Sequence, residues 1–165
     1  MQGVHHRGGL AMWFVVVLGA AASALAGSAK GTVAYKGTTA TITHAYLVKG
    51  PDAVESTKTI RRLILVATDL EAKLSACKVM SCSDGEVSEG MTLDLDGGAR
   101  VNYWVALKGQ MVQYSGTAVP ATLKTTTDKP DHMVGTFVVD DPSAGGPKVD
   151  VQFDAALLKE FTAAR

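Results

Sequence analysis

The sequence contains few histidines and cysteines, the side chains most often used in catalysis and metal binding, which limits the reactions that the chain could catalyse. Histidines occur at four positions and cysteines at two, namely His5, His6, His44, His132, Cys77 and Cys82. Residues 75–78 match a Ser-x-x-Lys pattern, but catalysts that use this pattern need further serine and lysine elements, which the sequence lacks. A Gly-x-Ser-x-Gly motif does not occur in it. We therefore predict no catalytic residue and no cofactor.

Two histidines lie outside the first 26 residues, and neither has an obvious chemical partner. In residues 38–48 the alternation places His44 on the apolar face of a strand, which is typical of a core histidine with a hydrogen-bonded ring. His132 follows the turn-like segment Asp128-Lys-Pro-Asp131, where solvated polar residues are expected. An alternative stays open, in which a small hydrolase or metal-dependent enzyme uses either histidine with nearby carboxylates. That alternative requires at least three polar residues to converge in one pocket.

Carboxylates occur in close pairs, and one pair, Asp94 and Asp96, lies in a predicted strand. Alternation places both on one face, opposite Leu93 and Leu95, as expected for a solvated polar face. The Asp-Gly-Gly sequence at residues 96–98 departs from the spacing of a calcium-binding loop, which requires a further ligand before the glycine and a distant glutamate. We therefore predict no metal site.

Cys77 and Cys82 are predicted to form a local disulfide bond, because exported proteins reach an oxidising compartment. A metal or redox pair is the weaker alternative. Zinc sites usually draw on further cysteines or histidines, and redox-active pairs are spaced Cys-x-x-Cys. Closing a loop of about six residues stabilises a chain by roughly 2 kcal/mol, which can pin a loop but cannot hold up a fold.

Export is predicted because residues 1–26 show the features of a cleavable secretory signal peptide. Arg7 precedes the apolar run of residues 10–18, and Ala24-Leu25-Ala26 forms an A-x-A cleavage pattern. The strongly apolar part is shorter than the roughly 20 residues of a spanning helix, and an uncleaved anchor is the alternative. The sequence thus predicts a periplasmic or extracellular protein with no membrane span after signal cleavage.

Residues 27–165 form the predicted mature chain of 139 residues, a common size for a single domain. This part carries 15 lysines and arginines against 16 aspartates and glutamates, which gives a net charge of −1. We expect no nucleic-acid partner, because proteins that bind nucleic acid usually carry a strong excess of positive charge.

Turn residues divide this domain into short β-rich runs. Strands are expected at residues 31–35, 38–48, 60–67, 91–96, 100–107, 110–115, 119–126, 132–139 and 148–155. One short helix is expected at residues 69–78, with Leu70, Leu74 and Cys77 along one side. This pattern predicts an all-β fold, an antiparallel β-sandwich of Ig-like general architecture with one short helix. A small β-barrel is the alternative.

Trp104 is the one tryptophan outside the predicted signal peptide, and it supplies a candidate binding surface. Alternation sets Trp104 on the same strand face as Arg100 and Lys108, opposite Tyr103. An exposed aromatic ring flanked by two cations would form part of such a surface. The alternative is a covered face, with the loop of residues 80–90 or the C-terminal tail lying over it.

Segments near both ends of the domain carry a resemblance to other proteins. They read Gly31-Thr-Val-x-Tyr-Lys-Gly37 with His44-Ala-Tyr46, and Val149-x-Val-x-Phe-Asp-Ala155. These strand and turn patterns resemble uncharacterised exported bacterial β-sandwich proteins. The resemblance implies an exported β domain and carries over no catalytic or binding residue.

The leading hypothesis for function is an exported, non-catalytic module of the cell envelope. It would bind an envelope protein or a small ligand through a sheet face or an edge strand. The hypothesis follows from the lack of a reactive set of side chains in the sequence. A structural subunit of the envelope is a third alternative, beside the enzyme.

Overall fold

The computed structural model describes residues 27–96, 101–118, 122–140 and 145–165, and this part of the chain is mostly antiparallel β-sheet. The all-β prediction is confirmed. The strands are β1 (Ser28–Tyr35), β2 (Thr38–Pro51), β3 (Thr59–Val66), β4 (Gly90–Leu95), β5 (Val101–Leu107), β6 (Gln110–Ala118), β7 (Leu123–Lys129), β8 (His132–Asp140) and β9 (Lys148–Glu160). The predicted signal peptide and Arg100 lie outside the described residues.

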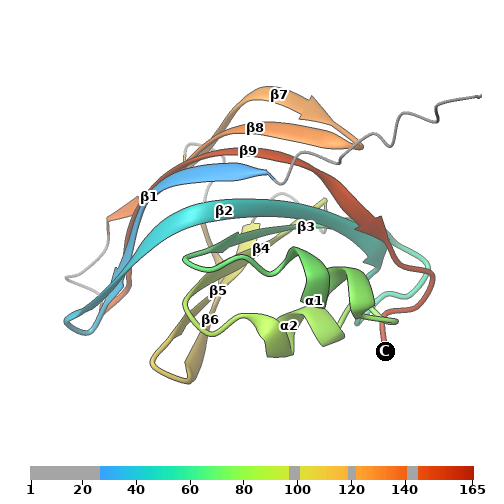
Figure 1. Ribbon diagram of the computed structural model, residues 1–165, viewed down its shortest axis with the longest axis horizontal. Coiled ribbons are helices and arrows are strands. Elements are labelled where there is room, and N and C mark those ends of the chain that lie inside the picture. The colour runs from blue at the N-terminus through green and yellow to red at the C-terminus, as the bar shows by residue number, and fades with distance from the viewer. Residues whose placement is uncertain (1–26, 97–100, 119–121, 141–144) are drawn as a thin grey trace, which may run out of the picture.

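The strands form one nine-stranded sheet in the order β6-β5-β4-β3-β2-β1-β9-β8-β7 (Figure 1). Neighbours in this order are antiparallel, and β2 and β9 make an additional parallel pairing. β1 lies between β2 and β9, with Ser28 opposite both His44 and Asp154. Beyond the start of β1 the two long strands meet directly, with Leu47 opposite Leu157. The first and last strands of the domain are therefore neighbours in the interior of the sheet.

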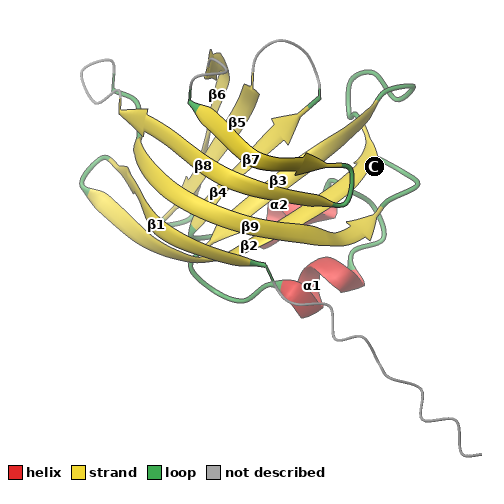
Figure 2. Cartoon of the chain, turned by 90° about the horizontal axis from the view of Figure 1, so that it is seen from above, coloured by secondary structure: helices red, strands yellow, loops and turns green. Residues whose placement is uncertain are grey.

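The sheet curves so strongly that strands far apart in its order pack face to face (Figure 2). The ring centroid of Tyr103 on β5 lies 5.5 Å from that of Phe137 on β8, and the centroid of Tyr35 on β1 lies 6.2 Å from that of Tyr114 on β6. We call the face that encloses these rings the inner face and the opposite face the outer face. The inner face carries the larger hydrophobic cluster, which draws side chains from β1 to β5, β8 and β9.

Two short helices, α1 (Glu71–Ala76) and α2 (Cys82–Glu86), cover part of the outer face (Figures 1 and 2). The second hydrophobic cluster joins them to the sheet, and it consists of Tyr46, Val48, Ile60, Ile64, Val66, Leu70, Leu74, Cys77, Met80, Val87, Ala106 and Phe161. Neither helix, nor any other helix in the described part of the chain, is long and apolar enough to span a membrane.

The predicted disulfide bond is present and joins Cys77, just after α1, to Cys82, the first residue of α2. The single predicted helix corresponds to α1, whereas α2 was not predicted. Sequence reasoning assigned residues 80–90 to a polar loop because they are rich in serine, aspartate and glycine. In the structure the buried Ser83 hydroxyl donates to the carbonyl oxygen of Met80 at 2.6 Å, which satisfies that side chain within a helical turn.

The predicted β-sandwich is not confirmed, because the structure contains one continuous open sheet. The alternative prediction, a small β-barrel, is not confirmed either. Within the described residues the edge strands β6 and β7 each pair with one neighbour, so the sheet does not close on itself. Alternation predicts which residues are buried, and both a two-sheet sandwich and one folded sheet bury two facing surfaces. The arrangement of strands within one sheet or two is therefore not encoded in the alternation.

Candidate functional site

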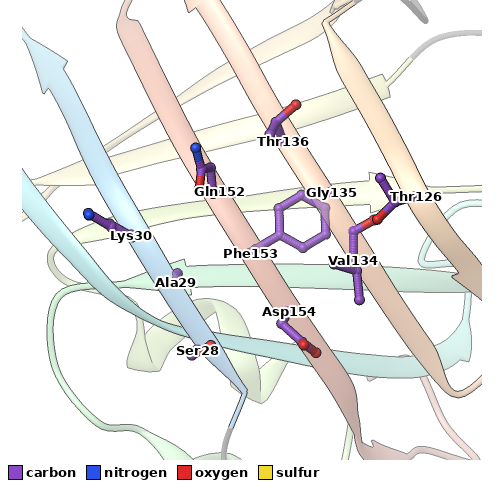
Figure 3. A pocket seen from close by; sticks show the side chains of 10 residues that line it. All are labelled: Ser28, Ala29, Lys30, Thr126, Val134, Gly135, Thr136, Gln152, Phe153 and Asp154. Carbon is purple, nitrogen blue, oxygen red and sulfur yellow. The ribbon is translucent and has the colours of Figure 1, made fainter.

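A groove of about 340 Å³ crosses the outer face of β1, β9, β8 and β7 (Figure 3). Ten residues line it, namely Ser28, Ala29, Lys30, Thr126, Val134, Gly135, Thr136, Gln152, Phe153 and Asp154. None of the lining residues belongs to the helix-covered cluster, which β9 reaches only near its C-terminal end, at Leu158. We take it as the candidate site because polar side chains from four strands converge there.

Alternation in β9 explains which side chains reach the groove. Phe153 is buried in the inner cluster, whereas its neighbours Gln152 and Asp154 are exposed on the outer face. Strand register then builds two rows across the groove. In one row Gln152 is paired with Lys30 on one side and Thr136 on the other, and in the second row Asp154 is paired with Ser28 and Val134.

Much of the hydrogen-bonding capacity of the groove is not used within the protein. Across the described ranges, the side chains of Ser28, Lys30, Thr136 and Gln152 form neither a hydrogen bond nor an ion pair with another residue. Together they offer an ammonium group, two hydroxyls and an amide. A ligand placed here would meet both donors and acceptors, beside the apolar side chain of Val134.

His132 lies in a strand rather than in a loop, and it contacts Asp154, which lines the groove. It is the first residue of β8, and its Nε2 atom lies 2.7 Å from Oδ1 of Asp154. The side chains are 39% and 58% exposed, so water weakens their interaction and the pair contributes little to stability. Sequence reasoning missed this contact because it depends on the β8–β9 register. The one available signal was the outward position of Asp154 in the last strand.

His44 is half-buried on the outer face, and the prediction of a core position is wrong. The core-facing residues of β2 change from Ala40 and Ile42 to Ala45 and Leu47, where the pairing with β1 shifts register. A shift of this kind breaks the period of two and transfers the following side chains to the other face. His44 therefore stacks on the ring of Tyr46, with their centroids 6.4 Å apart.

The hydrogen bonds around His44 define its tautomer when the ring is neutral. The Thr43 hydroxyl donates its one hydrogen to the carbonyl oxygen of Ala67 at 2.9 Å. Its oxygen, 2.9 Å from Nδ1 of His44, must then accept from that nitrogen. The proton of the neutral ring is therefore on Nδ1, which leaves Nε2 as an acceptor.

The outer face brings together part of the set of side chains that the enzyme alternative requires. Ser28 lies between His44 and Asp154 in the sheet, so a hydroxyl, an imidazole and a carboxylate share one row of the outer face. Among the described residues, however, no hydrogen bond joins the Ser28 hydroxyl to either histidine. Within the same ranges no group of three His, Cys, Asp or Glu side chains is placed to hold a metal ion.

The residues of the predicted tryptophan surface do not meet in one described site. Trp104 is half-buried, and the guanidinium carbon of Arg62 lies 5.9 Å from its ring centroid. Lys108 lies about 13 Å further along the chain, at the β5–β6 turn, and the intervening Ala106 is buried in the helix-covered cluster. Since Arg100 lies outside the described residues, a binding role for this set stays a prediction.

Two adjacent arginines of β3 form ionic clusters that sequence reasoning missed. Arg62 points to the outer face, where its Nε and Nη2 atoms lie 2.5 and 2.9 Å from the two carboxylate oxygens of Asp94. Its Nη1 atom lies 2.5 Å from Oδ1 of Asp84 in α2. This cluster joins α2 to the sheet beside Trp104. Burial raises the pKa of Asp84, although the charge of Arg62 opposes that shift.

Arg61 points to the opposite face and lines an open cavity of about 430 Å³ at one end of the curved sheet. It donates to Asp96 from Nε and Nη2 and to Asp128 from Nη1, at 2.6, 2.9 and 2.6 Å. Asp94 and Asp96 thus bind different arginines, contrary to the predicted shared face. Asp96 has a positive φ of 67°, and this left-handed residue ends the alternation of β4.

Comparison with known proteins identifies no relative: no family model, curated protein or solved structure matches the chain.

Proposed function

We propose that this chain is an exported, non-catalytic module of the cell envelope that binds an extended segment of a partner protein at the outer groove. The convergence of unused polar groups in this groove is the observation that carries the proposal. Lys30, Thr136 and Gln152 belong to three neighbouring strands and form one row across it. A row of donors and acceptors on a sheet face suits the polar backbone and side chains of a peptide.

The edge strand β7 supports a polypeptide as the partner. One side of β7 pairs with β8, and within the described residues its other side pairs with no strand. An edge of this kind can pair with an extended peptide through backbone hydrogen bonds. Alternate side chains of such a peptide would pass over the outer face beside Thr126, which lines the groove.

Export is supported by the order of residues in the predicted signal peptide and by the Cys77–Cys82 disulfide bond, which is a type of bond that persists in oxidising compartments. Intact mass and N-terminal sequencing of the protein purified from the periplasm or medium test this part of the proposal. A mature chain that begins at Gly27 is expected. A protein that stays in the cytoplasm and still carries residues 1–26 would contradict the proposed export.

Photo-crosslinking from the groove tests the binding site. A photoreactive amino acid at Thr136, in the groove, is compared with the same amino acid at Thr41, an exposed position of the outer face on β2 outside the groove. We expect one envelope protein to be captured from Thr136 and not from Thr41. A Lys30→Ala, Gln152→Ala variant should reduce that capture at unchanged stability, because both side chains are exposed and without partners in the protein.

Equal capture from Thr136 and Thr41 would refute a specific role of the groove, as would full capture by the Lys30→Ala, Gln152→Ala variant. A structural envelope subunit predicts a different result, which is self-association that rises with concentration. Sedimentation of the mature domain over a range of concentrations separates these two functions.

A hydrolase is the second candidate, and the pairing of His132 with Asp154 beside Ser28 favours it. Any hydrolytic activity found with the purified protein should then disappear in a His44→Ala, His132→Ala variant, because the imidazoles are the available general bases at neutral pH. Full retention of the activity by this variant would remove the candidate.

A further inference from the structure

Two hairpin tips with the same short sequence lie at one end of the molecule (Figure 1). The β1–β2 turn contains Lys36-Gly37, and the β5–β6 turn contains Lys108-Gly109. In both turns the lysine and the glycine have positive φ, at 46° and 75° in the first turn and 51° and 74° in the second. Two-residue hairpin turns of this geometry favour asparagine, aspartate or glycine at the first position, because other residues are strained there.

The repeated use of lysine at a strained position calls for a compensating role. Asparagine would relieve the strain at either tip without changing the turn. Strained backbone tends to be kept where a side chain serves a function. What lysine adds over asparagine at such a tip is a positive charge at the end of a long side chain.

The lysine side chains of both tips line the same cavity. It has a volume of about 240 Å³ and is lined by Tyr35, Lys36, Thr38, Leu107, Lys108 and Gln110. This lining contains two ammonium groups and no carboxylate. The outer groove, the Arg61 cavity and a hollow of about 260 Å³ beside β1 and β9 each contain at least one aspartate in their lining. The cavity between the tips is therefore the one of these four that presents only positive charge.

Neither tip lysine is neutralised within the described part of the chain, where no carboxylate lies within 4.0 Å of Lys36 or Lys108. The Lys36 ammonium lies 5.2 Å from the ring centroid of Tyr35, a contact that holds a cation over an aromatic face. The pKa of Tyr35 is lowered chiefly by its hydrogen bond with Tyr114, and Lys36 lowers it further through a hydrogen bond and its charge.

We propose that the cavity between the two hairpin tips binds a phosphate group, held by the ammonium groups of Lys36 and Lys108. Phosphate carries up to two negative charges and several acceptor oxygens, and lysine binds it as a point charge from any direction. The Thr38 hydroxyl and the Gln110 amide line the same cavity and can donate to the remaining oxygens. The proposal does not depend on the outer groove, because the two linings share no residue, although β1 contributes to both.

A Lys36→Asn, Lys108→Asn variant tests the site, because asparagine removes both charges while it suits the left-handed backbone. The probes are inorganic phosphate and pyrophosphate in calorimetric titrations, and sedimentation with phosphatidylglycerol vesicles against phosphatidylcholine vesicles. A Lys78→Gln, Lys124→Gln variant is the matched control, since it removes two exposed lysines away from this cavity. Circular dichroism of both variants checks that they fold.

We expect the unmodified protein to bind pyrophosphate or the anionic vesicles, and the Asn variant to bind about tenfold more weakly for each lysine removed. The thermal midpoint of the Asn variant should be unchanged or higher because the turns lose strain. Binding of the free anions would identify a soluble phosphate compound as the ligand class, and binding of the vesicles alone would identify a lipid headgroup.

Two results would overturn the proposal. One is the failure of the unmodified protein to bind any of the probes. The other is an equal loss of binding in the Lys78→Gln, Lys124→Gln control, which would show that net charge and not the cavity attracts the anion.

Discussion

Replacement of Arg62 by methionine tests whether the buried ionic cluster holds α2 on the sheet. Methionine keeps a long apolar side chain in place of the arginine stem and removes the guanidinium group. Arg62 is 6% exposed, and the side chain of Asp94, which it binds with two hydrogen bonds, is 16% exposed. Removal of one partner from a buried pair leaves the other charge uncompensated, at a cost of about 3 kcal/mol in stability.

The neighbouring Arg61 provides a matched control, because the same substitution is made one residue away in the same strand. The carboxylates that bind Arg61 are more exposed, at 41% for Asp96 and 50% for Asp128. After a change of Arg61 to methionine, water can solvate both carboxylates. We therefore expect a loss of about 1 kcal/mol for this variant.

Urea unfolding followed by circular dichroism measures both losses as changes in the unfolding midpoint at constant slope. The difference between the variants should be about 2 kcal/mol, which for a domain of this size corresponds to roughly 4–8 °C in melting temperature. Equal losses, or a larger loss for Arg61→Met, would refute the assignment of a buried cluster to Arg62 and an exposed one to Arg61.

Three further predictions concern single features of the fold. Tyr46→Phe should destabilise the domain by about 1–3 kcal/mol in urea unfolding, because the backbone amide that donates to the Tyr46 hydroxyl would stay buried without a partner, and an unchanged midpoint would contradict this. Burial and the hydrogen bond with Asp69 raise the pKa of Tyr46 to about 12, so the ionisation that this variant loses from an ultraviolet titration of the folded protein should lie near that pH. A Cys77→Ser, Cys82→Ser variant should lose roughly 2 kcal/mol of unfolding free energy, and treatment of the unmodified protein with reductant should give a similar loss. Alkylation of both thiols without reductant would show that the bond is absent. Asp96 has a lowered pKa because its arginine partner donates to it, so its stabilisation is full above the unfolded pKa of about 3.9 and lost as pH falls through the folded pKa. Asp96→Asn should therefore flatten the acid limb of the stability curve, and parallel limbs would count against the ion pair.

The strands were predictable from sequence because their burial follows a local pattern. In β9 the apolar Val149, Val151 and Phe153 alternate with exposed polar residues, and the structure retains that alternation. The disulfide bond was predictable as well, since the short spacing of Cys77 and Cys82 and their predicted compartment leave few other roles. These features depend on residues that are neighbours in the chain.

The sites were less predictable because each joins strands that are distant in the chain. His132 meets Asp154 through the β8–β9 register, and His44 leaves the core because β2 changes face where its pairing with β1 shifts. Alternation also predicted that Asp94 and Asp96 share a face, but a left-handed residue at the end of β4 separates them.

Local patterns were enough to predict that the domain is mostly β, where most of its strands lie and which of their faces are buried, because these properties follow from the period of two and from turn residues. Three features became evident only from the fold: the strands form one folded sheet, four of them line the outer groove, and Lys36 and Lys108 line one cavity. Register and curvature arise from contacts between strands. Those contacts are set by the packing of the whole core and cannot be read from any single segment.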